Sequence, residues 1–384
     1  MTKLIKIIYF IFLSFYILLF QTVNAQEKIR IGLLVPMTGD NKKIGESIIK
    51  AVGLAVKDID NDLIEIFPKD TATRSNQTLK SAFELSEMGI KIVIGPVFYE
   101  SLTYLDEMKD LTFLSLTNKT LDLPKNVISA GINSTSQFNT IKKFLEINEI
   151  KRTIFLTPIQ DYEFEVKKGM KNSKIKIYKD YEYNTEPTKL TKQIEEITNY
   201  RIRKQNLEDE IKRIENSDED NKEKKLEKLN KRDTLGKIGY DSVVIADFDE
   251  SLKSVTTSLL YTDVSPKKIS FISLNQWFDK TLFKETASQP ISFPSVNKEN
   301  LDQFKKNFKE VYNYDPNQLS LITYDLVGLV YYLLLQNDFE INDNIFKKKN
   351  RFKGISGIFE IKNKKINHEL NFYSVDAEKF IRIF

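Results

Sequence analysis

The segment LLVPMTGDNKKIGES, residues 33–47, contains the residue types of a phosphate-binding loop: an apolar run, two glycines and the start of a helical pattern. A loop of the form GxxxxGK[ST] holds phosphates with backbone amides and places a lysine on the outer phosphate. Here five residues separate Gly39 from Gly45, and Glu46 occupies the lysine position, where its carboxylate would repel phosphate. A GxGxxG motif is also absent. The sequence therefore does not predict a nucleotide site.

Other catalytic and metal-binding patterns fail as well. One histidine, His368, and no cysteine leave no His-based triad and no His/Cys metal cluster. His368 lies in a strongly polar segment, which favours a surface position. The acidic run 58–62 resembles the start of a calcium loop, but Leu63 and Lys69 stand where that loop needs glycine and glutamate. Ser356 lacks the spacing of a nucleophile elbow. We therefore expect no catalytic residue, no metal and no cofactor.

The N-terminus has the pattern of a secretory signal. Lys3 and Lys6 precede 14 nearly uninterrupted apolar residues, Ile7 to Phe20, and Ala25 ends a small-residue cleavage motif. The apolar run is short for a membrane span. We expect residues 1–25 to be a signal peptide, the protein to be periplasmic, and no stable membrane span to remain after cleavage. The alternative is an uncleaved anchor helix. A lipid anchor would need a cysteine after the cut, and the chain has none.

Composition and charge favour a protein without a nucleic-acid partner. The formal net charge is +4 with 29% charged residues, whereas a nucleic-acid-binding domain would carry a basic surplus. The lack of cysteine also excludes a disulfide framework. The residues that follow the signal are numerous enough for two domains.

Short apolar runs alternate with segments of helical period, which is the pattern of a parallel sheet with helices on both faces. Two series of strands are predicted, at 29–35, 63–67, 90–95 and 112–116, and at 152–157, 174–178, 241–246 and 268–274. Residues 44–59 predict an amphipathic helix. Residues 318–335 predict a buried helix, because they are apolar nearly all round. The tail 354–375 predicts a strand hairpin that turns at 363–365. Two series indicate two α/β lobes.

Residues 190–235 interrupt this alternation. Two helix-like runs flank a polar break at 216–221, and eleven basic and ten acidic residues lie between Arg201 and Asp233. A narrow apolar seam is predicted from Ile194, Ile197, Leu207, Ile211 and Ile214, which Leu226 and Leu229 can meet. We predict an antiparallel, coiled-coil-like helical hairpin that projects from the second lobe. It is either a docking arm for another protein or a solvated insertion tolerated in a surface loop.

The ordered series resembles a known family. Residues 29–56 resemble the opening of type I periplasmic binding proteins of the leucine/isoleucine/valine class, in which a first strand ends in a P-x-[ST]-G turn before a helix. GIKIVIGPVFYES, residues 89–101, resembles their third strand with its Gly-Pro turn, and residues 127–137 resemble the first crossing between lobes. Residues 241–250, 272–279 and 304–334 most resemble the branch of penicillin-binding protein activators. The likeness covers nearly all of the chain after the signal, apart from the charged segment.

The resemblance implies two Rossmann-like, doubly wound α/β lobes joined by three crossings, with a ligand cleft between them. It predicts lobe 1 from residues 29–132 and 290–350, and lobe 2 from residues 133–289 and 351–384, with 190–235 as an insertion in lobe 2. Open α/β sheets bind ligands at the carboxyl ends of their strands. The cleft candidates are therefore Thr38, Asp40, Tyr99, Ser101, Thr117, Asn118 and Lys119 from lobe 1, and Asp161, Tyr162, Asp247, Asn275 and Trp277 from lobe 2.

Several of these residues have a second interpretation. Trp277, the only tryptophan, either forms an aromatic wall of the cleft or packs between the lobes. Asp161 is either a cleft residue or a helix N-cap. Thr38 and Asp40 can satisfy amides of the turn or of the helix start, and the turn at Gly39 then forms the lip of the cleft, with the N-terminus of the helix facing it.

The resemblance implies two functions. The first is a non-catalytic periplasmic regulator that stimulates peptidoglycan synthesis through a cell-wall synthase, a penicillin-binding protein. The alternative is a solute-binding receptor for an amino acid or a related small polar ligand, which delivers it to an ABC transporter permease or a sensor. Amino-acid-binding members hold the ligand carboxylate with small hydroxyl residues and amides of the Gly-Pro loop, where this chain has Phe98, Tyr99 and Glu100. The activators are lipoproteins, and this chain lacks the lipid-accepting cysteine.

Overall fold

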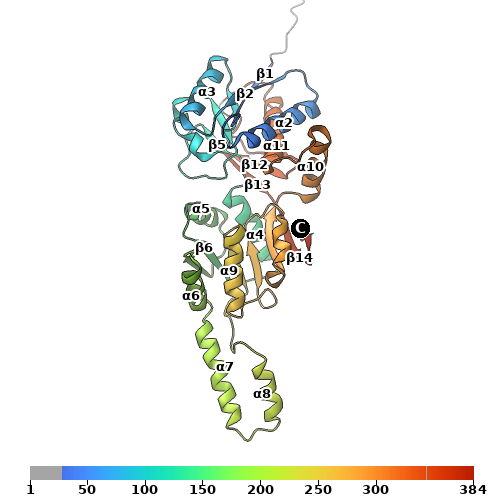
Figure 1. Ribbon diagram of the computed structural model, residues 1–384. Coiled ribbons are helices and arrows are strands. Elements are labelled where there is room, and N and C mark those ends of the chain that lie inside the picture. Colours follow the sequence, from blue (N-terminus) through green and yellow to red (C-terminus); the bar gives the residue numbers. More distant parts are fainter. Residues whose placement is uncertain (1–27, 343) are drawn as a thin grey trace, which may run out of the picture.

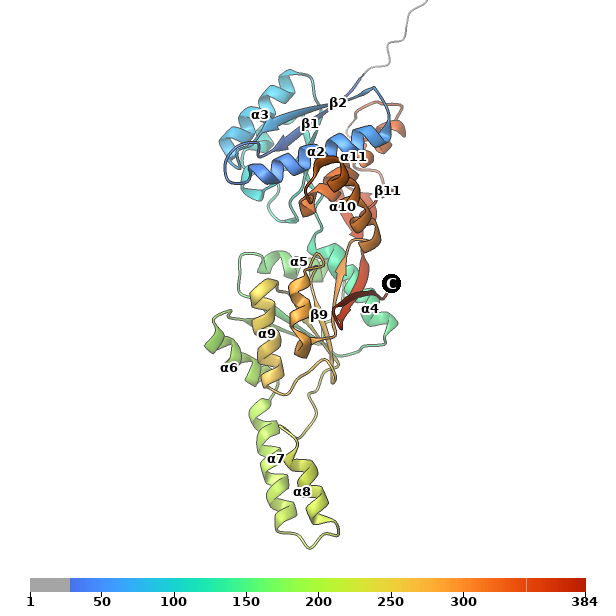
Figure 2. The same cartoon turned by 45° about the vertical axis from the view of Figure 1, so that its right-hand side comes forward.

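The structure is a computed structural model that describes residues 28–342 and 344–384, so the expected signal peptide lies outside the described residues. Two α/β lobes stack on one another, and a pair of helices, α7 and α8, projects from the second lobe on the side away from the first (Figure 1). The turned view shows the same stacking and the same projection (Figure 2). The two predicted α/β lobes are therefore present.

The first lobe contains a parallel five-stranded sheet in the order β2-β1-β3-β4-β5. Leu33 of β1 packs with α2 and α11 in one core cluster, while its neighbour Leu34 packs with α3 in another. This alternation follows from the period of two in a strand that is covered on both faces. The strands are β1 (Ile29–Val35), β2 (Ile64–Asp70), β3 (Ile92–Ile94), β4 (Thr112–Ser115) and β5 (Val127–Ser129).

The helices of this lobe are α2 (Lys42–Ile59), α3 (Ser75–Glu87), α10 (Lys298–Tyr312) and α11 (Gln318–Leu335), with short 3-10 turns η1 (Tyr99–Leu102) and η2 (Leu105–Glu107). By length and composition α11 could cross a membrane. In this fold it is a core helix, since side chains such as Leu326 and Val330 are fully buried against the cluster that contains α2. The predicted buried helix is thus observed over the predicted residues.

The second lobe contains a seven-stranded sheet in the order β15-β14-β10-β9-β8-β6-β7. The pairs β10–β14 and β14–β15 are antiparallel, and the others are parallel. The strands are β6 (Thr153–Pro158), β7 (Lys179–Tyr183), β8 (Ser242–Ile245), β9 (Ser270–Ser273), β10 (Ile291–Ser295), β14 (Asn371–Asp376) and β15 (Lys379–Arg382). One face carries α4 (Ser134–Ile147) and α5 (Glu163–Ser173), and the other carries α6 (Pro187–Ile197) and α9 (Asp249–Tyr261). The 3-10 turns η3 (Lys280–Lys284) and η4 (Thr286–Ser288) precede β10.

Three crossings join the lobes, but the segments do not divide as predicted. The boundary predicted at residue 290 is wrong, because β10 pairs with β9 and β14 and therefore belongs to the second lobe. Residues 350–369 form a separate antiparallel sheet of β11 (Asn350–Lys353), β12 (Ile358–Lys362) and β13 (Lys365–Glu369), which lies between the lobes in Figure 1. The ring of Phe352 in this sheet lies against Gly328 of α11. The sheet is therefore separate from the seven-stranded sheet and contacts both lobes, since the amide of His368 in β13 donates to the hydroxyl of Ser136 in α4 at 2.8 Å.

The single histidine is buried, contrary to the predicted surface position. The ring of His368 in β13 lies in a hydrogen bond of 2.9 Å with the carbonyl oxygen of Ala130, and its centroid is 4.5 Å from that of Phe359. Burial lowers the pKa of His368 to about 4. The polar residues around it in the sequence point outward on alternate positions of the strand, which is why composition alone suggested exposure.

One predicted strand is displaced. Residues 174–178 form a connection, and β7 begins at Lys179. Ile175 is buried in the cluster beneath α4 and α5, whereas β7 is an edge strand in which only Tyr183 is buried. Of the alternating apolar residues only Ile175 is buried, while Ile177 and Tyr178 are exposed, so the alternation does not mark a strand here.

The projecting pair consists of α7 (Tyr200–Glu215) and α8 (Lys222–Asn230), and we call these helices with their connecting turn the hairpin. Leu207 and Ile214 of α7 are buried, and Leu226 and Leu229 of α8 are half-buried. The first helix-like run is interrupted, because Asn199 adopts a left-handed conformation with φ of 51° between α6 and α7. Ile194, predicted for the seam, is consequently buried in the body of the lobe.

Candidate ligand site between the lobes

A cavity of about 470 Å³ lies where the strand ends of the two lobes meet, and we call it the inter-lobe cavity. Its volume is within the usual range of small-molecule sites. The first lobe contributes the loops after β3, β4 and β5, and the second lobe contributes the loops after β8 and β9. The polar and aromatic residues that line it are Phe98, Tyr99, Glu100, Thr117, Asn118, Lys119, Gln137, Phe248, Asn275 and Trp277.

Six of the twelve cleft candidates line this cavity: Tyr99, Thr117, Asn118, Lys119, Asn275 and Trp277. They come from loops at the carboxyl ends of β3, β4 and β9, which is where an open α/β sheet places its ligand. The structure therefore brings together residues that are far apart in the sequence and that were chosen by this rule.

A cation lies over an aromatic ring on the first-lobe side of the cavity. The ammonium nitrogen of Lys119 is 4.4 Å from the centroid of the Tyr99 ring, within the range of a cation–π interaction. Burial raises the pKa of the Tyr99 hydroxyl, and the carboxylates of Asp122 and Glu165 add to this effect. Among the described residues no carboxylate pairs with the Lys119 ammonium. The cavity therefore contains an unpaired cation, Lys119, together with the carboxylate of Glu100.

The second-lobe wall is held by a residue that sequence reasoning missed. Gln137 of α4 accepts a hydrogen bond of 2.8 Å from the backbone amide of Asn275, whose side chain accepts one of 3.0 Å from the amide of Trp277. Trp277 adopts a left-handed conformation with φ of 47°, which this chain of bonds supports. Gln137 lies on a helix of the first crossing, so a rule based on strand ends does not find it.

Asp247 and Tyr162 belong to the interior of the second lobe rather than to the cavity wall. The carboxylate of Asp247 accepts hydrogen bonds from the hydroxyl of Tyr162 at 3.0 Å, from the hydroxyls of Tyr183 and Ser251, and from the amide of Phe248 at 2.8 Å. Burial beside this carboxylate raises the pKa of both tyrosines. A carboxylate with so many internal donors positions the loop after β8 and has little capacity left for a ligand.

Three further candidates also lie away from the inter-lobe cavity. Ser101 is buried in η1, and its hydroxyl has no hydrogen-bond partner among the described residues. Asp161 is exposed before α5, and the N-cap of that helix, Tyr162, makes no side-chain capping bond. Asp40 is exposed on the loop after β1.

The glycine loop after β1 lets α2 begin close to the end of the strand. Asp70 at the end of β2 accepts hydrogen bonds from the amide of Met37 at 2.7 Å and from the hydroxyl of Thr38 at 2.5 Å. A Cβ atom on Gly45 would lie 1.9 Å from the carbonyl oxygen of Pro36, so only glycine lets α2 start this close to the strand end. Neither Thr38 nor Asp40 lines the inter-lobe cavity. The expectation that this loop forms the lip of the site is not met.

A buried carboxylate links the lobes beside the cavity, and we call this contact the inter-lobe latch. Glu165 of α5 accepts hydrogen bonds from the amides of Thr120 and Leu121, at 2.8 and 2.6 Å. Lys168, one turn later, donates to the carbonyl oxygen of Thr120 at 2.7 Å. The latch therefore fixes the first-lobe loop that carries Asn118 and Lys119 against the second lobe.

The lining residues supply the chemistry of recognition: one cation, one carboxylate, three side-chain amides, two hydroxyls and aromatic walls. Across residues 28–342 and 344–384, no group of three or more histidine, aspartate or glutamate side chains is placed to hold a metal ion. A site of this kind suits a small ligand that has an anionic or polar group on an apolar body.

Comparison with solved structures identifies the architecture. A putative branched-chain amino acid ABC transporter from Rhodospirillum rubrum aligns with a TM-score of 0.70 at 13% identity, covering 93% of this chain and 100% of that one. This chain has the type I periplasmic binding-protein fold. No family model matches its sequence, and no curated protein matches it.

Two further solved structures have this fold. The C-domain of LpoA from Haemophilus influenzae, a regulator of PBP1A, aligns with a TM-score of 0.63 at 13% identity, covering 92% of this chain and 100% of that one. LivJ from Streptococcus pneumoniae in complex with isoleucine aligns with a TM-score of 0.52 at 17% identity, covering 93% and 99%. The chain spans 60% of the length of full-length LpoA, with a TM-score of 0.63.

Proposed function

We propose that the protein is an exported, non-catalytic regulator that contacts a peptidoglycan synthase. The fold that it has in common with the LpoA C-domain, a regulator of PBP1A, supports this proposal. The sequence pattern that most resembles penicillin-binding protein activators supports it as well. The N-terminal signal pattern would bring the protein to the periplasm.

The observation that carries the proposal is the hairpin. Its charged side chains pair with each other, as Arg213 does with Glu210 and Glu219 and Lys225 does with Glu219. Figures 1 and 2 show it standing clear of both lobes. A projecting arm of this kind offers a surface that another protein can reach, whereas a small ligand would bind between the lobes.

The test replaces residues 205–232 by a short Gly-Ser linker and measures binding to purified peptidoglycan synthases and their polymerisation rate. We expect the intact protein to bind and stimulate a synthase, and the variant to lose this effect while its melting temperature stays close to that of the intact protein. The matched control is the double variant Tyr99→Ala/Trp277→Ala, which alters the inter-lobe cavity and should keep the stimulation. No effect of the intact protein on any synthase would refute the proposal.

The alternative function, a receptor for a small polar solute, is favoured by the inter-lobe cavity and by Lys119, which lies over Tyr99 without an ion pair among the described residues. A ligand that binds only the folded state raises the melting temperature. A thermal-shift screen with amino acids, amides and muropeptides would identify such a ligand. The receptor function requires that Tyr99→Ala/Trp277→Ala abolishes the shift and that replacement of the hairpin leaves it unchanged, which is the reverse of the pattern expected for a regulator.

A further inference from the structure

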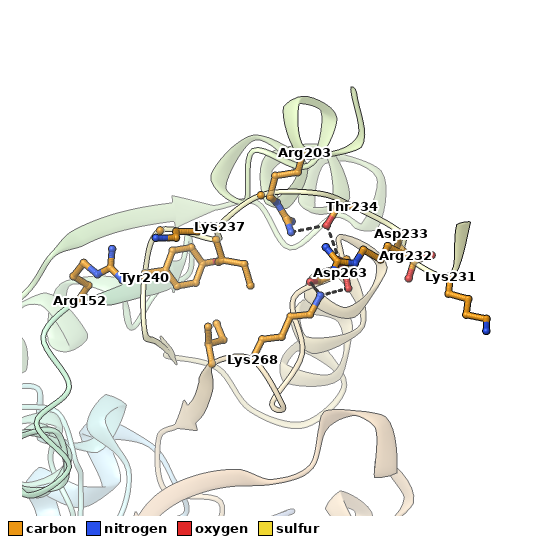
Figure 3. A pocket seen from close by; sticks show the side chains of 14 residues that line it. Arg152, Arg203, Lys231, Arg232, Asp233, Thr234, Lys237, Tyr240, Asp263 and Lys268 are labelled. Atoms are coloured by element: carbon orange, nitrogen blue, oxygen red, sulfur yellow. Dashed lines mark hydrogen bonds and ion pairs between the residues drawn. The ribbon is translucent and has the colours of Figure 1, made fainter. Parts of the chain in front are cut away.

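A second cavity, of about 580 Å³, lies at the base of the hairpin, and we call it the root pocket (Figure 3). Arg152, Tyr240 and Ile269 line it, and they precede β6, β8 and β9. The root pocket is therefore at the amino ends of β6, β8 and β9, whereas the loops at the carboxyl ends of β8 and β9 line the inter-lobe cavity. The segment 231–240, which leads from α8 back to the sheet, forms one wall.

The root pocket is strongly basic. Six of its lining residues are basic and two are acidic: Arg152, Arg203, Lys231, Arg232, Lys237 and Lys268 against Asp233 and Asp263. This excess contrasts with the near balance of charges along the hairpin as a whole.

Part of this charge is neutralised within the chain, and part is not. Arg152 pairs with Asp241 at 2.7 Å, Lys268 with Asp263 at 2.5 Å, and Lys231 with Glu227 at 2.6 Å. Among the described residues the side chains of Arg232 and Lys237 make no ion pair and no hydrogen bond. Two cations on one wall of the pocket are thus available to a ligand.

A third cation is fixed in the wall without a directly bonded carboxylate. Arg203 is only 3% exposed, and its guanidinium donates to the carbonyl oxygens of Thr198 and Thr262 and to the hydroxyl of Thr234. Figure 3 shows the Arg203 side chain reaching Thr234, which in turn donates to Asp263 at 2.6 Å. Neutral acceptors hold the guanidinium in place but leave its charge, so the field in the pocket remains positive.

The pocket also has an apolar part. Ile238 and Ile269 line it together with the ring of Tyr240. Tyr240 is 7% exposed, and its hydroxyl finds no hydrogen-bond partner in the part of the chain that the structure describes. Apolar surface beside fixed cations suits a ligand that joins oxyanion groups to a carbon framework.

We propose that the root pocket binds a small oxyanion ligand with two or more negative charges, carried by phosphate or carboxylate groups, between Arg232, Lys237 and the wall that contains Arg203. Such groups form charge-assisted hydrogen bonds with arginine and lysine, which are stronger than neutral ones. The site is separate from the inter-lobe cavity, and the proposal does not depend on either proposed function.

Isothermal titration at constant ionic strength tests this inference with two probes, inorganic pyrophosphate and citrate. We expect saturable binding of at least one probe with a stoichiometry of one, and a rise in melting temperature with the same ligand dependence. Binding of pyrophosphate alone assigns phosphate ligands to the pocket, and binding of citrate alone assigns carboxylate ligands. The absence of saturable binding by both probes would overturn the proposal.

Two double variants distinguish the pocket from general attraction to a basic surface. Arg232→Gln/Lys237→Gln removes the two unpaired cations and breaks no ion pair or side-chain hydrogen bond of the described residues, so it should fold normally. We expect it to weaken binding by about tenfold or more. Lys224→Gln/Lys228→Gln removes the same charge from exposed positions of α8 outside the pocket, and should leave binding within about twofold of the intact protein. Equal losses in both variants would show non-specific attraction and refute the site.

Discussion

Glu165 accepts two hydrogen bonds from Thr120, one from the backbone amide at 2.8 Å and one from the hydroxyl at 2.9 Å, and so joins α5 of the second lobe to a loop of the first. Glu165 is only 7% exposed, so water does not easily replace these bonds. The loop that Thr120 belongs to also carries Lys119 over Tyr99. The separation of the lobes and the position of the cavity cation therefore depend on the same carboxylate.

Glu165→Ala should weaken this connection. The change leaves the amides of Thr120 and Leu121 without an acceptor, so we expect the free energy of unfolding to fall by about 2–3 kcal/mol. Urea denaturation measures this loss, and small-angle scattering should show a larger radius of gyration as the lobes separate. Glu223→Ala, an exposed position on α8, is the control and should change neither quantity. Unchanged stability and scattering in Glu165→Ala would contradict the role of the latch.

Gly45→Ala should destabilise the start of α2. Its Cβ would lie 1.9 Å from a backbone oxygen, so the helix must move away from the strand end. We expect a loss of about 1–3 kcal/mol in the free energy of unfolding. Gly53→Ala is a matched control in the same helix, because its Cβ would approach nothing closer than 3.6 Å. That variant should be neutral or more stable, since alanine favours helix by up to about 1 kcal/mol over glycine. Similar effects of the two substitutions would contradict the close approach.

His368 should make the protein sensitive to acid. Burial lowers its pKa to about 4 from an ordinary value of 6.5, so between these values the unfolded chain binds a proton that the folded chain excludes. The contribution of His368 to the free energy of unfolding is fully present above pH 6.5. It is lost as the pH falls towards 4, by up to roughly 3 kcal/mol. Urea denaturation at pH 7 and 4.5 measures this loss. His368→Gln should lack this part of the pH dependence, and an equally steep loss in the variant would show that other groups cause it.

Asp325 should have the opposite effect. Burial raises its pKa to about 6, although it accepts hydrogen bonds from the amides of Ile355 and Ser356 at 2.8 and 2.7 Å. Between pH 6 and about 3.8 the folded chain holds a proton that the unfolded chain has lost, so Asp325 favours folding as the pH falls. This contribution offsets part of the loss at His368.

Asp325→Asn removes that offset and is therefore expected to be more sensitive to acid than the intact protein between pH 6 and 4. The measurement is the free energy of unfolding from urea denaturation across this range. The double variant Asp325→Asn/His368→Gln serves as the control. It should lose the contributions of both residues to the change of the free energy of unfolding with pH. A single Asp325→Asn variant that resists acid better than the intact protein would contradict the assigned pKa shift.

Local pattern predicted those elements whose burial is nearly complete. The strand at Ile29–Val35 and the helix at Gln318–Leu335 are observed over the predicted residues, because a continuous apolar run leaves few alternatives. The strand predicted at 174–178 is wrong because only Ile175 is buried there, whereas Ile177 and Tyr178 are exposed. The position predicted for His368 is wrong because tertiary contacts bury it. The break between α6 and α7 at Asn199 has no apolar signature, so the sequence pattern predicts one continuous helix there.

The site was predictable to the extent that strand ends define it. This rule located Tyr99, Lys119 and Trp277, but not Gln137, which comes from a helix. It also included Asp247, whose donors lie within its own lobe and are invisible in the sequence. The sequence does not indicate the root pocket, because the balance of charges between Arg201 and Asp233 does not reveal which cations lack a partner.

The hairpin leaves and rejoins the second lobe at a single point, where Arg203 bonds to Thr234 at 3.0 Å and the amide of Leu235 donates to the carbonyl oxygen of Arg203 at 2.8 Å. The two ends of the segment between these residues therefore lie side by side, so another folded segment with adjacent ends could replace it. A fluorescent domain or an epitope inserted at this position would be held by the same contacts. The strand connections within the lobes would not change.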